Sequence, residues 1–164
     1  LSASFTGRER TSGEGKGFSH MRIRQMTEKD VPTVALIERD CFSEPWSEQG
    51  FLDGMANSTV FFAAEDDRGN VVGYIGMYLM KPEGEITNVA VAKEVRGRGI
   101  GAALVAAMQQ WAEEHGIERI VLEVRVSNAP AIHVYEEKGF ITIGVRKNFY
   151  RLPTEDAGIM EWQK

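Results

Sequence analysis

A basic, glycine-rich turn lies between an apolar run and a long helical pattern in this chain. The apolar run is Val89, Ala90 and Val91, and helical spacing of apolar residues follows over residues 99–115. Glycines let a backbone approach a ligand closely, and a helix N-terminus offers N–H groups and partial positive charge. The turn therefore predicts a site for a phosphorylated ligand, formed by Arg96, Gly97, Arg98, Gly99, Ile100, Gly101 and Ala102.

Length and composition describe one ordinary globular domain. The 164 residues are 43% hydrophobic and 26% charged, with a formal net charge of -5. A nucleic-acid binder needs a basic face, so this charge argues against direct nucleic-acid contact and favours a basic partner. No apolar run approaches the ~20 residues that span a membrane, and Cys41 is the only cysteine. We therefore expect a cytoplasmic protein with no disulfide framework and no metal site.

The start of the chain differs from the rest. Residues 1–20 are rich in Ser, Thr, Gly and charge, with no apolar period and no signal-peptide core. We expect them to be a disordered extension or an expression remnant, with Met21 as a native start. Residues 21–164 would then form the folded domain.

Apolar periodicity and turn signals divide residues 21–164 into strands and helices. Meander strands come first, and a strand–helix–strand–helix–strand unit follows. This order predicts an α/β fold with a mixed sheet and helices on both faces. The expected strands cover residues 23–26, 60–65, 71–80, 85–92, 119–126, 140–145 and 159–162, and the expected helices cover residues 31–41, 99–115 and 129–138, with another beginning after Ser47.

Two nucleotide-binding motifs are alternative interpretations of the glycine turn. A Walker-type loop needs Gly-Lys-Ser/Thr, which is absent here. A dinucleotide-binding turn is matched by Gly97, Gly99 and Ala102, with Glu123 in the next strand. However, five residues separate Val91 from Gly97, little chain remains for such a sheet, and Glu123 lies inside its strand rather than at the end. The dinucleotide hypothesis is therefore the weaker one.

Several segments of the chain resemble motifs of the GCN5-related N-acetyltransferase (GNAT) family, and they occur in the same order as in that family. The family's acetyl-coenzyme A (acetyl-CoA) signature, Arg/Gln-x-x-Gly-x-Gly/Ala, is matched by residues 96–101. Further family marks are matched at residues 88–91, 122–128 and 131–140, and the resemblance covers residues 21–164. It implies the GNAT fold, with a mixed, mostly antiparallel central sheet, and acetyl-CoA as co-substrate.

The resemblance also implies how acetyl-CoA would bind. Its pyrophosphate would sit on the N–H groups of residues 97–102, with charge from Arg96 and Arg98, whose side chains could equally be solvated. Its pantetheine arm would lie along the backbone of residues 89–91 like an added strand, while their side chains pack in the core. Asn128 would contact the arm through its amide, and it also suits the N-cap of the following helix.

Two residues are candidates for the attack of an amine on a thioester. Glu123 lies within an apolar run, where burial would raise its pKa toward a value useful for a base. Strand alternation alone makes it a solvent-facing residue; the resemblance favours a general base, acting directly or through a water molecule. Tyr135 lies about two helical turns beyond Asn128, and its phenol could donate a proton to the leaving sulfur. A core aromatic beside Phe140 is the alternative.

Acceptor recognition would involve two segments. Trp46 and Tyr150, with the acidic pair Glu155 and Asp156, are expected to form the walls of a groove for a basic peptide. Trp46 also fits a hydrophobic staple with Phe51, and the acidic pair also fits a solvated turn. Both alternatives stay open.

Four segments narrow the resemblance to the branch of the family that acetylates the N-terminal alanine of the eighteenth small-subunit ribosomal protein. They cover residues 45–48, 122–128, 146–150 and 155–160, and Arg151 departs from the family pattern, which has Pro there. We expect a monomer or weak dimer. Two alternatives remain: the same catalyst with a small amine or another protein as acceptor, and a CoA-binding module without turnover.

Overall fold

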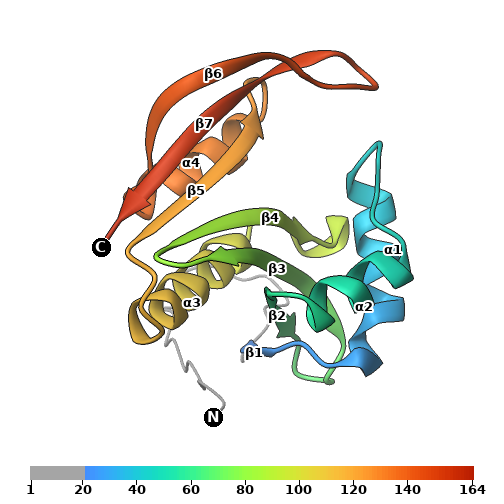
Figure 1. Ribbon diagram of the computed structural model, residues 1–164. Helices are drawn as coiled ribbons and strands as arrows, with labels where there is room; N and C mark the ends of the chain where they lie inside the picture. The colour runs from blue at the N-terminus through green and yellow to red at the C-terminus, as the bar shows by residue number, and fades with distance from the viewer. Residues whose placement is uncertain (1–20) are drawn as a thin grey trace, which may run out of the picture.

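The computed structural model describes residues 21–164 (Figure 1). The strands of this part of the chain are β1 (Arg22–Gln25), β2 (Thr59–Glu65), β3 (Val71–Met80), β4 (Glu83–Val91), β5 (Arg119–Arg125), β6 (Ile141–Tyr150) and β7 (Glu155–Gln163). They form one sheet in the order β1-β2-β3-β4-β5-β7-β6. Every neighbouring pair is antiparallel except β4 and β5, which are parallel. The mixed, mostly antiparallel sheet is therefore confirmed. The extension expected over residues 1–20 lies outside the described residues.

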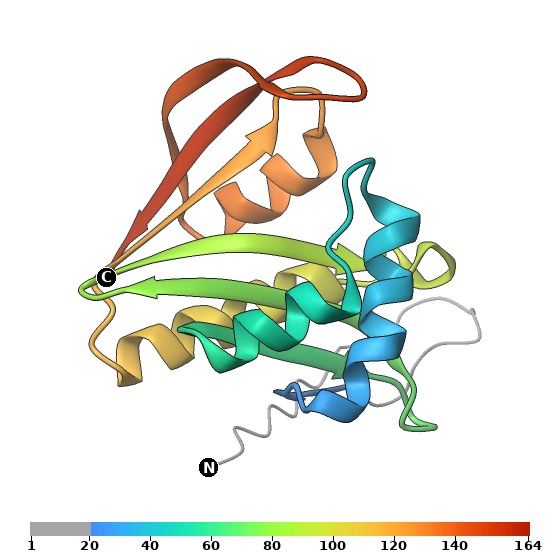
Figure 2. The same ribbon diagram turned by 45° about the vertical axis from the view of Figure 1, so that its right-hand side comes forward.

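The α-helices of the described residues are α1 (Val31–Cys41), α2 (Glu48–Ala56), α3 (Ile100–Glu114) and α4 (Ala129–Glu137). They cover both faces of the sheet, as predicted (Figure 2). On one face, α1 and α2 pack against a cluster that includes Phe61 and Tyr74. On the other face, α3 and α4 contribute Leu104 and Tyr135 to a larger cluster with β5.

The start of α2 follows the signals in the sequence. Ser47 is its N-cap and accepts a hydrogen bond from the backbone N–H of Gly50 at 3.1 Å. The rings of Trp46 and Phe51 pack with their centroids 5.4 Å apart, so the hydrophobic staple is confirmed. The staple fixes the end of the α1–α2 loop, residues 42–47.

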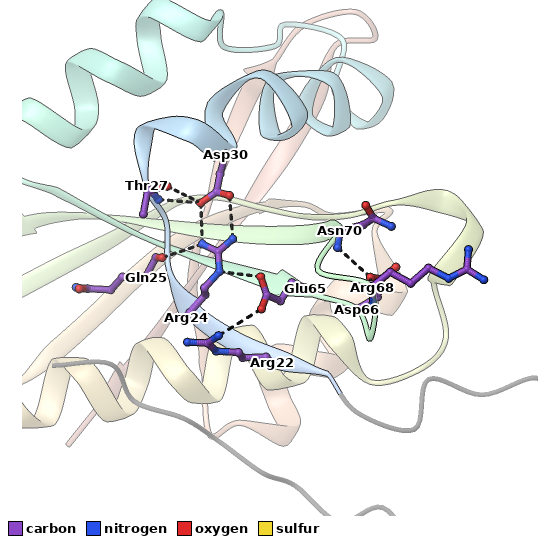
Figure 3. Close-up of polar contacts among 9 residues, drawn as sticks. All are labelled: Arg22, Arg24, Gln25, Thr27, Asp30, Glu65, Asp66, Arg68 and Asn70. Carbon is purple, nitrogen blue, oxygen red and sulfur yellow. Dashed lines mark hydrogen bonds and ion pairs between the residues drawn. The ribbon is translucent and has the colours of Figure 1, made fainter.

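A partly buried ion pair ties β1 to the start of α1 (Figure 3). Arg24 donates to both carboxylate oxygens of Asp30, at 2.7 and 2.9 Å, and to Glu65 of β2 at 2.9 Å. Asp30 also accepts a hydrogen bond from the backbone N–H of Thr27 at 2.8 Å, as a capping box requires. The Arg24 guanidinium holds the pKa of the Asp30 carboxyl below its ordinary value. Charge as well as packing therefore holds this corner of the sheet.

The C-terminal hairpin is longer than the sequence predicts. Strands are expected over residues 140–145 and 159–162, but β6 continues to Tyr150 and β7 begins at Glu155. No regular apolar alternation marks residues 146–150. The register also shifts between Arg146 and Tyr150, where Asn148 has a φ of 55°. Tyr150, Glu155 and Asp156, which are expected to help form the walls of a groove, thus lie at the end of a paired hairpin.

β4 and β5 separate partway along their length. Their parallel pairing ends at Ile86 and Leu122, and Figures 1 and 2 show the strands spreading apart beyond that point. At the same place the pairing of β3 with β4 skips Thr87, which forms a β-bulge. Residues 87–91 of β4 therefore run on without β5 beside them.

Candidate active site

A cleft of about 590 Å³ lies where β4 and β5 diverge. Its lining comes from the end of α1 and the α1–α2 loop, residues 86–89, residues 122–125, α4 with the residue before it, and residues 149–153. We call it the active-site cleft. It brings together six residues that the sequence analysis singled out: Trp46, Val89, Glu123, Asn128, Tyr135 and Tyr150.

The predicted phosphate-binding turn leads into the N-terminus of α3. Gly97 and Gly99 have φ values of 78° and 81°, a left-handed backbone that glycine adopts without strain. Gly99 is the N-cap of α3, and a Cβ added at Gly97 would meet nothing within 4 Å. The turn is exposed up to Gly99, whereas Ile100 is buried in the core. An exposed glycine turn beside the first N–H groups of a helix fits a diphosphate.

The side chain of Arg96 folds back toward the end of β4. Its Nε donates to the carbonyl oxygen of Val91 at 3.1 Å, and its Nη2 lies 3.1 Å from Sγ of Cys41. Arg96 therefore links the glycine turn to the ends of β4 and α1. Ala90 is buried and Val89 lines the active-site cleft, so this stretch of β4 serves both the core and the open edge.

Asn128 is the N-cap of α4. Its Oδ1 accepts a hydrogen bond from the backbone N–H of Ala131 at 3.3 Å, which confirms the capping role. It also lines the active-site cleft. Its side-chain NH2 group carries two further donors. The same amide can therefore cap the helix and present a donor to a ligand.

Glu123 lies on β5 at the active-site cleft, and its side chain is 19% exposed. Burial raises the pKa of its carboxyl, and the carboxylate of Glu85 on β4 raises it further. Arg146 on β6 acts in the opposite direction, with its Nε 3.4 Å from Oε1 of Glu123. Glu123 is thus neither a core residue nor a fully solvated one. Its raised pKa suits a group that accepts a proton near neutral pH.

Tyr135 lies on α4, is 8% exposed and lines the same cleft. Its ring packs on Phe140 with the centroids 5.7 Å apart, so the core-aromatic alternative also describes its packing. Burial raises the pKa of the phenol above its ordinary value. The hydroxyl therefore stays protonated at neutral pH and can serve as a proton donor.

The four residues expected to contact an acceptor divide into two pairs. Trp46 and Tyr150 line the active-site cleft, whereas Glu155 and Asp156 do not. Oδ1 of Asp156 accepts a hydrogen bond from the backbone N–H of Asn148 at 2.9 Å. Asp156 is thus directed to a donor of the hairpin, whereas Glu155 accepts hydrogen bonds from Arg125 of β5 and from the backbone N–H of Ser127.

Arg125, at the end of β5, has a role that the sequence analysis missed. Its guanidinium pairs with Glu155 at 3.2 Å and donates to the carbonyl oxygens of Arg151 and Pro153, both at 2.9 Å. It also lies 4.5 Å from the ring centroid of Tyr150. Arg125 therefore shapes the hairpin turn that lines the cleft.

Arg151, the departure from the family pattern, joins two parts of the cleft lining. Its Nε donates to Oε1 of Glu44 at 2.9 Å, and its carbonyl oxygen accepts a hydrogen bond from Oγ of Ser43 at 3.3 Å. The α1–α2 loop and the hairpin turn are thereby linked.

Glu38 is a second residue that the sequence analysis missed. It is 3% exposed and lines the cleft, and burial raises the pKa of its carboxyl to about 7. A signal was present, because Glu38 follows Val34 by four residues and so lies on the apolar stripe of α1.

Residues 21–164 contain no group of three or more His, Cys, Asp or Glu placed to hold a metal ion. None of the helices in this range combines the length and the apolar character needed to cross a membrane.

Comparison with solved structures gives the class of protein. The crystal structure of the ribosomal-protein-S18-alanine N-acetyltransferase from Escherichia coli aligns with a TM-score of 0.81 and 29% identity, covering 88% of this chain and 94% of that one. The fold of this chain is thus shared with an N-acetyltransferase.

Sequence comparison gives the family. Residues 31–140 match the acetyltransferase (GNAT) family. A relative from Bacillus subtilis, provisionally named a ribosomal protein bS18-alanine N-acetyltransferase, is 34% identical over 84% of this chain and 92% of its own length. An N-alpha-acetyltransferase from Sulfurisphaera tokodaii is 35% identical over 90% of this chain and 95% of its own length. The chain belongs to the GNAT family and is an N-acetyltransferase.

Proposed function

We propose that this GNAT enzyme transfers the acetyl group of acetyl-CoA to a protein N-terminus, with the N-terminal alanine of ribosomal protein bS18 as its acceptor. The observation that carries the proposal is that Glu123 and Tyr135, a candidate base and a candidate acid, line one cleft beside the open edge of β4. The names of the relatives from Bacillus subtilis and Sulfurisphaera tokodaii support an α-amine as acceptor. A cytoplasmic location goes with a ribosomal acceptor.

Three parts of the chain would hold acetyl-CoA. The N–H groups of residues 97–102 would receive the diphosphate, with Arg96 and Arg98 supplying charge. The edge of β4 over residues 87–91, from which β5 diverges, would pair with the pantetheine amides as an added strand would. The NH2 group of Asn128 would contact the same arm.

The reaction is the attack of an amine nitrogen on the carbonyl carbon of a thioester. A free α-amine has a pKa of ~8, so part of it is protonated at neutral pH, and the attacking nitrogen must lose a proton. Glu123 accepts this proton, directly or through a water molecule, as the C–N bond forms. The C–S bond then breaks, and Tyr135 gives its proton to the departing thiolate. The acceptor, held beside Trp46 and Tyr150, leaves as an amide.

Mass spectrometry of candidate acceptors tests this proposal. The full chain is incubated with acetyl-CoA and one acceptor in each of several parallel reactions. The acceptors are a peptide beginning Ala-Arg, peptides with other first residues, and a panel of small amines. We expect one acetyl group on the α-amine of the Ala-Arg peptide. Acetylation of small amines alone would reject a protein N-terminus as acceptor. Thiol release that never exceeds background would leave a CoA-binding module without turnover.

A further inference from the structure

Glu38 is a buried carboxylate that lies at the active-site cleft without an ion pair to any residue in the range 21–164. The backbone N–H of Trp46 donates to its Oε1 at 3.3 Å, and Nδ2 of Asn88 donates to its Oε2 at 3.5 Å. Both bonds are long, so they compensate weakly for taking a carboxylate out of water. An apolar side chain of similar size would suit the stability of this site at least as well. Glu38 therefore contributes by connecting Trp46 to Asn88 rather than by stabilising the fold.

One partner of Glu38 belongs to the acceptor side of the cleft. Trp46 ends the α1–α2 loop, and its ring packs against Phe51 and Phe61 with centroid distances of 5.4 and 6.2 Å. These ring contacts hold the side chain of Trp46. The bond to Glu38 holds its backbone, and the two together fix how the loop enters the cleft.

The other partner belongs to the bulge of β4. Asn88 is 7% exposed, and its Oδ1 accepts a hydrogen bond from Oγ1 of the bulged residue Thr87 at 2.7 Å. Gly76 on β3 makes room for it, because a Cβ at that position would lie 2.7 Å from Oδ1 of Asn88. The side chain of Asn88 is thus placed by two strands, and Glu38 is bonded to a fixed point.

We propose that Glu38 is a positioning residue that transmits the geometry of the β4 bulge, through Asn88, to the backbone of Trp46. It would thereby set the acceptor side of the cleft relative to the open edge of β4, where the thioester is expected. This inference rests on the proposed function, the acetylation of a protein N-terminus. Burial raises the pKa of Glu38 to about 7, and the N–H of Trp46 finds an acceptor oxygen in either protonation state.

Three variants of the full chain separate positioning from packing. Glu38→Leu keeps a side chain of similar size and removes both hydrogen bonds. Glu38→Gln keeps an acceptor oxygen for Trp46 and an amide that can pair with a rotated Asn88. Asp40→Asn removes the same charge from an exposed position of the same helix, outside the cleft lining, and is the matched control.

Two readouts are measured for each variant. The first is steady-state kinetics, with KM for the Ala-Arg peptide and KM for acetyl-CoA determined separately. The second is hydrogen exchange over residues 42–47 by mass spectrometry, which does not depend on activity. We expect Glu38→Leu to raise the peptide KM and the exchange rate about fivefold or more, with the acetyl-CoA KM within about twofold of wild type. The thermal midpoint of Glu38→Leu should be unchanged or raised. In Glu38→Gln the peptide KM and the exchange rate should return most of the way to the wild-type values, and Asp40→Asn should match the wild type.

Two results would overturn the inference. One is a Glu38→Leu protein whose peptide KM and loop exchange equal those of the wild type. The other is a lowered thermal midpoint with both KM values raised together, as a loss of packing would give. Should Glu38→Leu not fold, Glu38→Asp, which keeps the charge but is one methylene shorter, takes its place in both measurements. A wild-type protein that acetylates no peptide would reject the proposed function, while the exchange data still decide whether Glu38 anchors the loop.

Discussion

Arg146 and Glu123 form an ion pair at the active-site cleft, with 3.4 Å between Nε of the arginine and Oε1 of the glutamate. The arginine side chain is 58% exposed and the glutamate side chain 19% exposed, so a solvated cation lies against a partly buried carboxylate. Burial and Glu85 raise the pKa of Glu123, and Arg146 lowers it. Burial together with charges on two other strands, β4 and β6, therefore sets the proton affinity of the proposed base.

Removing the cation should shift the pH dependence of the reaction. In Arg146→Gln the carboxylate of Glu123 loses a favourable charge, so its pKa rises and the acidic limb of kcat/KM moves to higher pH. We expect the shift to be small, because solvent screens an exposed arginine. Lys147→Gln, a charge removal at the next, also exposed, residue of β6, is the control. An acidic limb that does not move in Arg146→Gln would exclude this ion pair as a determinant of the pH profile.

Tyr135→Phe should remove the proton donor and keep the ring. The ring contacts Phe140, and this packing survives the substitution. We expect kcat with the Ala-Arg peptide to fall by at least about tenfold, with the thermal midpoint close to that of the wild type. A loss smaller than tenfold would assign Tyr135 to the core alone.

The ionisation of Glu38 should make stability fall as pH rises through the weakly acidic range. Below its ordinary pKa of 4.5 the carboxyl is protonated in both the folded and unfolded states, so it contributes nothing. Between 4.5 and about 7 the unfolded state ionises first, because burial raises the pKa in the folded state. The wild type should therefore lose about 3 kcal/mol of unfolding free energy relative to Glu38→Gln over this range. Urea unfolding of both proteins across pH measures the difference, and a constant difference would contradict the burial of this carboxyl.

Arg24 should contribute more to stability than Arg22, although both contact Glu65. Figure 3 shows Arg24 between Asp30 and Glu65, with Arg22 beside Glu65. The side chains of Arg24 and its partner Asp30 are 19% and 10% exposed, whereas that of Arg22 is 57% exposed. Arg24→Met leaves the Asp30 carboxylate without its cation, so we expect the unfolding free energy at neutral pH to fall by about 3 kcal/mol. Arg22→Met should cost less than about 1 kcal/mol. Equal effects of the two substitutions in urea unfolding would refute the importance of the buried pair.

Elements with strong periodicity could be predicted closely from the sequence. β3 matches the expected residues 71–80, and α3 differs from the expected 99–115 by one residue at each end. The turn end of the C-terminal hairpin could not be predicted, because residues 146–150 show no apolar alternation and their pairing depends on backbone hydrogen bonds and on the register shift around Asn148. Local patterns carry no signal for such pairing.

The candidate site also contains residues that could be predicted from the sequence and residues that could not. Glu123 and Tyr135 could be identified as candidates because each lies in a recognisable motif. The roles of Glu38 and Arg125 could not be predicted, because they arise from contacts between distant parts of the chain. Asn88 lies 50 residues from Glu38, and Arg151 lies 26 residues from Arg125. The pattern of apolar residues around such a side chain can indicate that it is buried. Its role can be assigned only when the fold shows which distant residues it contacts.

Glu123 is the proposed acceptor of the proton that the attacking α-amine loses. The most direct test is the acetylation rate of the Ala-Arg peptide by the wild type and by Glu123→Gln, followed by mass spectrometry at saturating acetyl-CoA, with CoA binding checked separately. We expect the glutamine variant to bind CoA normally and to lose about 10² to 10⁴ in kcat. A glutamine variant that acetylates the peptide as fast as the wild type would show that Glu123 is not the base.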